Sequence, residues 1–231
     1  MMSAADRSAR VAFFTIGQSP RIDVVPEMAE LLGPGVQIVE VGALDDLDEQ
    51  AIAALAPREG AYRFATRLRD GTQVELDSAA AEARLAQVME DADMQRYDVL
   101  VPLCTGTAMP RLNSVIIEPQ QVVDHAVAAL AQHCRKVGLM VPLASQLEHF
   151  HTACVIPAET RLAHASPYDA DRARSLARFE QAGRELADCD FIVMHCMGYS
   201  AWMREAVRQA SGRPVLLSNR LVAQALAQWL E

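Results

Sequence analysis

The sequence predicts an α/β protein made of two related lobes with mostly parallel sheets and a ligand cleft between them. Short apolar, β-rich segments alternate with helical segments along most of the 231 residues, which is the order expected of parallel strands joined by helical crossovers. Two segments far apart in the chain also align without a gap. Each carries a cysteine where a buried strand ends, and ligands of such sheets bind beyond the carboxyl ends of the strands.

Strands of the first half are expected where four to six apolar, largely β-branched or aromatic residues stand together. Asp70-Gly71 supplies the positive φ of a tight turn and predicts a β-hairpin, which breaks the alternation of strands and helices. Asp77 or Ser78 is a suitable cap for the helix that follows. The elements expected in this half are a strand at 11–16, a helix at 23–32, a strand at 36–41, a helix opened by the acidic run 45–49, the hairpin at 62–76, a helix at 78–94 and a strand at 99–103.

The second half restarts the same pattern. Pro119 suits the first turn of a helix, Gly212 a helix end, and Ser218 or Asn219 the cap of the last helix. The elements expected here are a helix at 119–134, a strand at 137–141, a helix at 171–187, a strand at 191–194, a helix at 200–210, a strand at 215–217 and a helix at 219–230. We therefore expect a mobile tail at 1–10, a first lobe at 11–120 completed by 218–231, and a second lobe at 121–217.

Composition excludes several classes of protein. The chain carries 21 Lys and Arg against 30 Asp and Glu, a net charge of −9, with no basic cluster that could follow a nucleic acid backbone. No apolar run is long enough to cross a bilayer, and the first ten residues lack a signal-peptide core. Five cysteines without a CxxC pair favour reduced thiols and a cytoplasmic protein. These features predict no nucleic-acid or membrane partner, and they are compatible with a homo-oligomer.

An internal repeat places two of the cysteines, Cys104 and Cys196, at equivalent positions. Residues 97–107 and 189–199 each run Asp, an apolar stretch, Cys, one further residue and Gly. Residues 10–14 resemble 136–140 in the same way. A single buried cysteine at a strand end is most simply explained by packing, because free cysteine is among the most buried residue types. Two such segments in two matching halves instead favour Cys104 and Cys196 as a functional pair.

Two thiols at equivalent strand ends suggest acid–base chemistry without a cofactor or a metal. One cysteine, as thiolate, can remove a proton from the carbon beside a carboxylate, and the other can return a proton on the opposite face. Loop N–H groups beyond the strands can hold the anion. The expected substrate-binding residues are Gly17, Gln18, Ser19, Arg21, Thr105, Gly106, Thr107, Met197, Gly198 and Tyr199. Sulfurs acting on one carbon from both sides should lie about 6–9 Å apart.

Several other residues have competing interpretations. Arg21 could bind a carboxylate or merely cap the following helix, and His195 could be a base, although an extended strand would point it away from Cys196. A metal site is the less favoured interpretation of Glu148, His149, His151 and Cys154, whose spacing does not match a zinc motif. Cys134, Cys154 and Cys189 are expected to pack. No GxGxxG, Walker or GxSxG motif is present.

Over nearly its whole length after residue 10, the chain resembles the AroM family. The resemblance rests on the stretches 11–17, 97–99, 117–119, 137–142, 196–199 and 214–219. It implies a link to aromatic biosynthesis and no defined activity. The paired cysteines are similar to those of the aspartate/glutamate/hydantoin racemase superfamily. That similarity implies two Rossmann-like lobes, Cys104 and Cys196 as the acid–base pair, and the loop 17–19 as a wall of the substrate pocket.

The sequence departs from the glutamate racemases at both cysteines. Thr105-Gly106 follows the first cysteine where they carry Asn-Thr, and Met197-Gly198 follows the second where they carry Thr-His. The acidic residue usual after their first strand is also absent, which argues against recognition of an amino group. We expect a racemase or epimerase of a small carboxylate compound. The alternatives are a decarboxylase or cis–trans isomerase on the same scaffold, or a metabolite-binding protein without catalysis.

Overall fold

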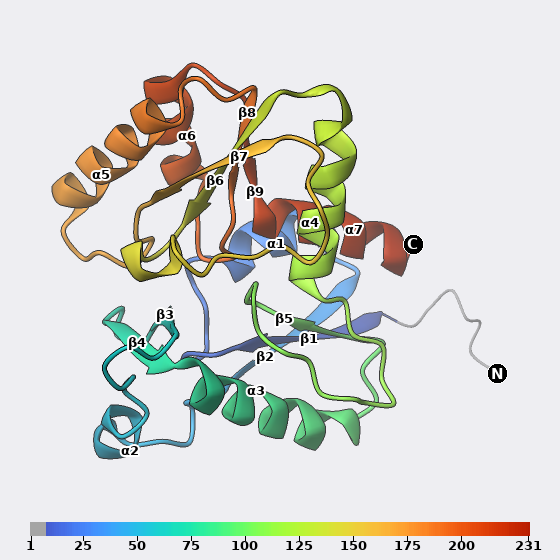
Figure 1. The fold of residues 1–231 in the computed structure, drawn as a ribbon. Coiled ribbons are helices and arrows are strands. Elements are labelled where there is room, and N and C mark those ends of the chain that lie inside the picture. The colour runs from blue at the N-terminus through green and yellow to red at the C-terminus, as the bar shows by residue number, and fades with distance from the viewer. Residues whose placement is uncertain (1–7) are drawn as a thin grey trace.

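The computed structural model describes residues 8–231, and within them the strands form two parallel sheets and one hairpin (Figure 1). The first sheet has the order β2-β1-β5 and the second the order β7-β6-β8-β9, which confirms the expected α/β fold with two mostly parallel sheets. The strands are β1 (Ala9–Thr15), β2 (Val36–Gly42), β3 (Arg63–Arg67), β4 (Gln73–Asp77), β5 (Val99–Pro102), β6 (Lys136–Val141), β7 (Glu159–His164), β8 (Phe191–Met194) and β9 (Val215–Leu217).

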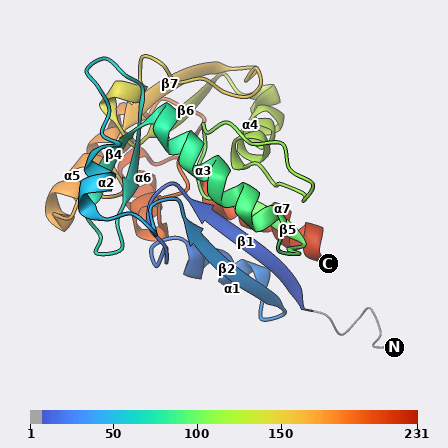
Figure 2. The same cartoon turned by 90° about the horizontal axis from the view of Figure 1, so that it is seen from below.

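The helices cover both faces of both sheets. One face of the first sheet packs on α3, and α1 and α7 lie between the two sheets (Figures 1 and 2). The outer face of the second sheet packs on α5 and α6, and its inner face packs on α4 and α7. The helices are α1 (Val25–Leu32), α2 (Glu49–Ala53), α3 (Ser78–Asp93), α4 (Pro119–Leu130), α5 (Arg172–Glu185), α6 (Ala201–Ser211) and α7 (Ser218–Leu230), with 3-10 turns at Ala131–His133 and Ala144–Gln146.

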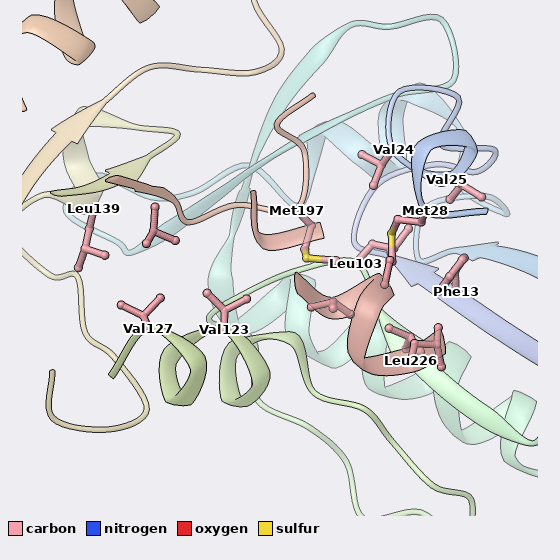
Figure 3. Close-up of a cluster of buried hydrophobic side chains, with 14 of the residues drawn as sticks. Phe13, Val24, Val25, Met28, Leu103, Val123, Val127, Leu139, Met197 and Leu226 are labelled. Atoms are coloured by element: carbon pink, nitrogen blue, oxygen red, sulfur yellow. The ribbon is translucent and has the colours of Figure 1, made fainter. Parts of the chain in front are cut away.

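One hydrophobic core is shared by both sheets. Figure 3 shows Phe13 of β1 and Leu139 of β6 in the same cluster, together with Val123 of α4 and Leu226 of α7. Burying one side chain of this size stabilises the fold by about 1.5–3 kcal/mol. Because α7 packs against α1 as well as α4, the end of the chain helps to hold the two sheets together.

The internal repeat has the same structural role in each sheet. Asp98 accepts a hydrogen bond from the backbone N–H of Arg10 at 2.7 Å, and Asp190 accepts one from the backbone N–H of Lys136 at 3.0 Å. In return, each aspartate donates its own N–H to the carbonyl of the same partner. The aspartate at the start of each repeat therefore sets the register between a cysteine-bearing strand and the first strand of its sheet.

Several helix ends follow their expected local signals. Asp77 accepts a hydrogen bond from the N–H of Ala80 and caps α3, while Gly212 ends α6 with φ 65°. The hairpin is also confirmed, and Gly71 in its turn has φ 95°. The last expected turn of α4 is instead a 3-10 turn, so this α-helix ends at Leu130 rather than at Cys134.

The structure corrects three other expectations. Strand β7 was not predicted, because its first three residues are polar and exposed at the sheet edge and give no apolar run. Ser218 and Asn219 do not cap α7: the Ser218 hydroxyl donates to the carbonyl of Met194, and the Asn219 amide donates to the carbonyls of Met197 and Tyr199. Of the expected tail, residues 1–7 lie outside the described residues, and residues 9 and 10 belong to β1.

No helix in the described part of the chain is both long and apolar enough to cross a membrane.

Candidate functional site

A pocket opens where the carboxyl ends of the strands of both sheets converge. It contains about 600 Å³ of empty space, counting the part open to solvent. Residues after β1 and β5 form one side, and residues after β6, β7 and β8 form the other. Strand β3 of the hairpin, with Tyr62 just before it, forms a further wall. The pocket therefore lies where ligands bind in parallel α/β sheets.

Cys104 and Cys196 both line this pocket, one following β5 and the other following β8. Both are free thiols that are only partly exposed. Burial raises the pKa of Cys104, the nearby Cys196 raises it further, and Arg21 lowers it. Burial also raises the pKa of Cys196, while the N–H of Gly198, which donates to its sulfur at 3.4 Å, lowers it. Burial therefore favours the protonated form of each thiol, and the proximity of the two thiols disfavours ionising both.

Arg21 lines the pocket as a buried cation held in a fixed orientation. Its Nε and Nη2 each donate to one oxygen of Asp23 at 2.9 Å, and Nη1 donates to Thr15 Oγ1 at 3.0 Å. Nη2 also lies 3.4 Å from the hydroxyl of Tyr168. A guanidinium has five N–H donors, so one Nη1 hydrogen has no partner among the described residues. Of the two interpretations of Arg21, this arrangement favours the carboxylate contact over a helix cap.

The loop Gly17–Ser19 does not line the pocket, which corrects the expectation that its N–H groups hold an anion. All three N–H groups are already used: they donate to Thr15 Oγ1, to the carbonyl of Arg67 and to Asp45 Oδ1, respectively. A Cβ at Gly17 would overlap the Arg67 carbonyl and the Thr66 hydroxyl. Glycine is required there because the hairpin packs directly against the loop.

The loop after β8 is also corrected in part. Met197 is fully buried in the shared core, as Figure 3 shows, and Tyr199 is buried with its hydroxyl bonded to the carbonyl of Ala165 at 2.9 Å. Gly198 packs against Tyr168 behind the pocket. These residues face away because the chain turns inward from β8 into α6. Gly198 contributes to the site only through its N–H.

The loop after β5 behaves differently from its counterpart. Thr105 and Gly106 line the pocket, and the Thr105 hydroxyl donates to the carbonyl of His195 across it at 3.3 Å. Thr107 is buried beside the pocket, where its hydroxyl lowers the pKa of Cys104, against the larger effect of burial. Among the expected substrate-binding residues, only Arg21, Thr105 and Gly106 therefore line the pocket.

A buried histidine–aspartate pair was not expected. His195 lines the pocket, and its Nε2 lies 2.6 Å from Oδ1 of Asp124 in α4. The other oxygen of Asp124 accepts the N–H of Ala153 at 2.7 Å. Because both carboxylate oxygens accept, Nε2 of His195 carries the proton. His195 and Cys196 both line the pocket beyond the end of β8, although the His195 ring bonds Asp124 of α4 on the inner face of the second sheet and Cys196 packs against the outer cluster. The signal for this pair in the sequence is Asp124, an aspartate within the apolar face of the helix predicted at 119–134.

Aromatic side chains form much of the remaining wall. Tyr62 and Phe64 of the hairpin segment meet edge to face at 5.6 Å, and Phe150 meets His195 in the same way at 5.0 Å. The hairpin is tied to the second sheet, because the Gln146 amide donates to the carbonyl of Arg63 at 3.3 Å. Sequence reasoning found the hairpin but not its role, since only its packing brings it to the strand ends.

Residues 8–231 contain no group of three or more His, Cys, Asp or Glu side chains arranged to hold a metal ion. Of the four residues weighed as metal ligands, only His151 lines the pocket.

Comparison with known proteins agrees with the fold described above. Residues 11–230 match the family model described as AroM protein. No curated protein sequence matches the chain significantly. Among solved structures, the chain is similar to a glutamate racemase from Thermus thermophilus, with a TM-score of 0.60, 17% identity, and coverage of 97% of this chain and 81% of that one. It is also similar to an allantoin racemase from Klebsiella pneumoniae, with a TM-score of 0.57, 16% identity, and coverage of 96% and 87%.

A third similar structure is an arylmalonate decarboxylase, with a TM-score of 0.54, 13% identity, and coverage of 96% of this chain and 92% of that one. At these identities the likeness shows the fold alone. It confirms the two-lobed α/β architecture and the resemblance inferred from the sequence.

Proposed function

We propose that this protein, which belongs to the AroM family, is a cofactor-independent isomerase of the racemase or epimerase type that acts on a small carboxylate compound. The observation that carries this proposal is the convergence of Cys104 and Cys196 on one pocket from equivalent strand ends of the two sheets. Arg21 lowers the pKa of both thiols against the larger effect of burial. The fold shared with two racemases supports the same reaction class.

The reaction moves one proton from the substrate to the first cysteine and another proton from the second cysteine to the substrate. One cysteine, as thiolate beside Arg21, takes the proton from the carbon next to the carboxylate. The electron pair of the broken C–H bond stays on the substrate as an enolate. The second cysteine, as thiol, donates its proton to the opposite face and restores the C–H bond, so thiol and thiolate have exchanged places. Mutual repulsion of the two sulfurs keeps one of them protonated, as the mechanism needs.

Deuterium exchange at the α-carbon tests this mechanism. The protein is incubated in D₂O with L-glutamate, L-aspartate, (S)-mandelate and L-lactate, and exchange and optical rotation are followed. At least one probe should exchange and racemise. Cys104→Ser and Cys196→Ser should each abolish racemisation, because a hydroxyl is a far weaker acid than a thiol, while Cys134→Ser, a cysteine outside the pocket, should have no effect. Full racemisation by both pocket variants would refute the mechanism.

A decarboxylase is the second candidate, and the apolar part of the wall favours it. Phe64, Leu103 and Val141 line the same pocket, where a carboxylate placed against them would lose its water and be destabilised. The fold shared with arylmalonate decarboxylase supports this alternative. If the protein releases CO₂ from phenylmalonate, and if this release depends on only one of the two cysteines, decarboxylation would be established over racemisation. Thermal stabilisation by a carboxylate without exchange or CO₂ release would instead indicate a binding protein.

A further inference from the structure

We propose that Thr66 of the β3–β4 hairpin binds the substrate carboxylate together with Arg21, and that the substrate carries an apolar substituent beside Phe64. This inference depends on the proposed function only in placing a carboxylate compound in the pocket. It assigns recognition to the hairpin, an insertion outside both parallel sheets.

Thr66 lacks a hydrogen-bond partner in a place where this is costly. Its side chain is 0% exposed, and Oγ1 makes no hydrogen bond within the described part of the chain. Buried hydroxyls are normally satisfied, and each exception needs an explanation. Other buried side chains within residues 8–231 also have a polar atom without a hydrogen bond, but among them only Thr66 lines the pocket. A ligand oxygen in the pocket would supply the missing partner.

Thr66 and Arg21 both line the pocket, and Gly17 and Thr15 link them. The Thr66 hydroxyl lies directly against the backbone of Gly17, where an added Cβ would overlap it. Thr15 Oγ1 joins this backbone to Arg21, because it accepts both the N–H of Gly17 at 3.2 Å and Nη1 of Arg21 at 3.0 Å. Arg21 keeps one Nη1 hydrogen for a ligand. Two donors on neighbouring groups match the two oxygens of a carboxylate.

The direction of β3 orients the rest of the ligand. Phe64 and Thr66 are two residues apart and lie on the same face of the strand, and both line the pocket. Thr66 lies at Gly17, while the Phe64 ring lies at Gly106, next to Cys104. A ligand with its carboxylate at Thr66 therefore carries its substituent towards Phe64 and the cysteine loop. An apolar or aromatic substituent fits there, and a charged one would lose hydration.

Binding of phenylacetate and of its neutral analogue phenylacetamide tests the assignment by calorimetry. Wild-type protein should bind phenylacetate at least tenfold more tightly than phenylacetamide. Thr66→Val should remove most of this preference, and Thr66→Ser should keep it. Thr160→Val changes an exposed threonine of β7 and serves as the matched control. Without ligand, Thr66→Val should be at least as stable as wild type, because the lost hydroxyl had no partner. If this variant does not fold, Thr66→Ala replaces it.

Unchanged phenylacetate affinity in Thr66→Val would overturn the proposal and assign the hydroxyl to a water molecule. Equal binding of the two probes by wild type, or no binding of phenylacetate, would overturn it as well. The outcome is independent of catalysis, since Cys104→Ser and Cys196→Ser should still prefer phenylacetate. A preference that depends on Thr66, found in a protein that exchanges no α-hydrogen, would support the carboxylate site while refuting the isomerase.

Discussion

Replacing Asp124 by alanine removes both acceptors of a buried polar network. Oδ1 accepts from Nε2 of His195 at 2.6 Å, and Oδ2 accepts from the N–H of Ala153 at 2.7 Å. Asp124 is 0% and His195 4% exposed, so water cannot easily replace the lost carboxylate. The substitution therefore leaves the buried Nε2–H of His195 without a partner, while the N–H of Ala153, an exposed residue, can bond water instead.

The expected loss follows from that donor. A stranded buried donor costs about 1–3 kcal/mol, so we expect Asp124→Ala to lower the free energy of unfolding by about 1–3 kcal/mol. In a chain of this size that corresponds to a fall in Tm of roughly 2–12 °C.

Urea unfolding followed by circular dichroism measures this loss. Asp124→Asn keeps one acceptor oxygen and should lose less than Asp124→Ala. The matched control is Asp91→Ala, which removes an exposed carboxylate of α3 whose only hydrogen-bond partner within residues 8–231 is the side chain of Gln87. It should change stability by less than about 0.5 kcal/mol. If Asp124→Ala lowers the free energy of unfolding by less than about 1 kcal/mol, or by no more than the control does, two ideas would be refuted. These are that water is excluded from the His195–Asp124 pair and that the pair stabilises the fold.

Three further predictions concern the groups around the pocket. Gly198→Ala should lower Tm, measured by calorimetry, because its Cβ would overlap the Tyr168 hydroxyl; an unchanged Tm would show that Tyr168 moves freely. Tyr199→Phe should cost about 1–2 kcal/mol in urea unfolding, since it removes the buried bond to the Ala165 carbonyl; no loss would mean that water enters there. Burial raises the pKa of Cys104 above its ordinary 9.0, so the native state holds this proton more tightly than the unfolded chain. The stability that this difference contributes is complete below pH 9 and is lost as pH rises through the raised pKa. Cys104→Ala should therefore lose less stability than wild type when unfolding is measured at alkaline pH. An identical loss in both proteins would contradict this prediction.

The fold was predictable because its signals are local and repeated. Buried parallel strands are apolar on both faces, and the aspartate that begins each repeat bonds the neighbouring strand in the same way, at Arg10 for Asp98 and at Lys136 for Asp190. The strand ends that carry the two cysteines followed from the same pattern. Strand β7 was missed because an exposed edge strand needs no apolar residues at its solvent side.

The composition of the site was decided by tertiary structure. A loop N–H looks free in sequence, yet those of Gly17–Ser19 donate to Thr15 of β1, to Arg67 of the hairpin and to Asp45, respectively. His195 and Asp124 are 71 positions apart and meet only because α4 packs on the second sheet.

The residue pattern predicts the strands other than β7, the repeat and the two cysteine positions, because each of these depends on neighbours along the chain. The partners of polar groups at the pocket were decided by packing between distant segments, because a hydrogen bond requires particular atoms within about 3 Å, which residue pattern does not encode.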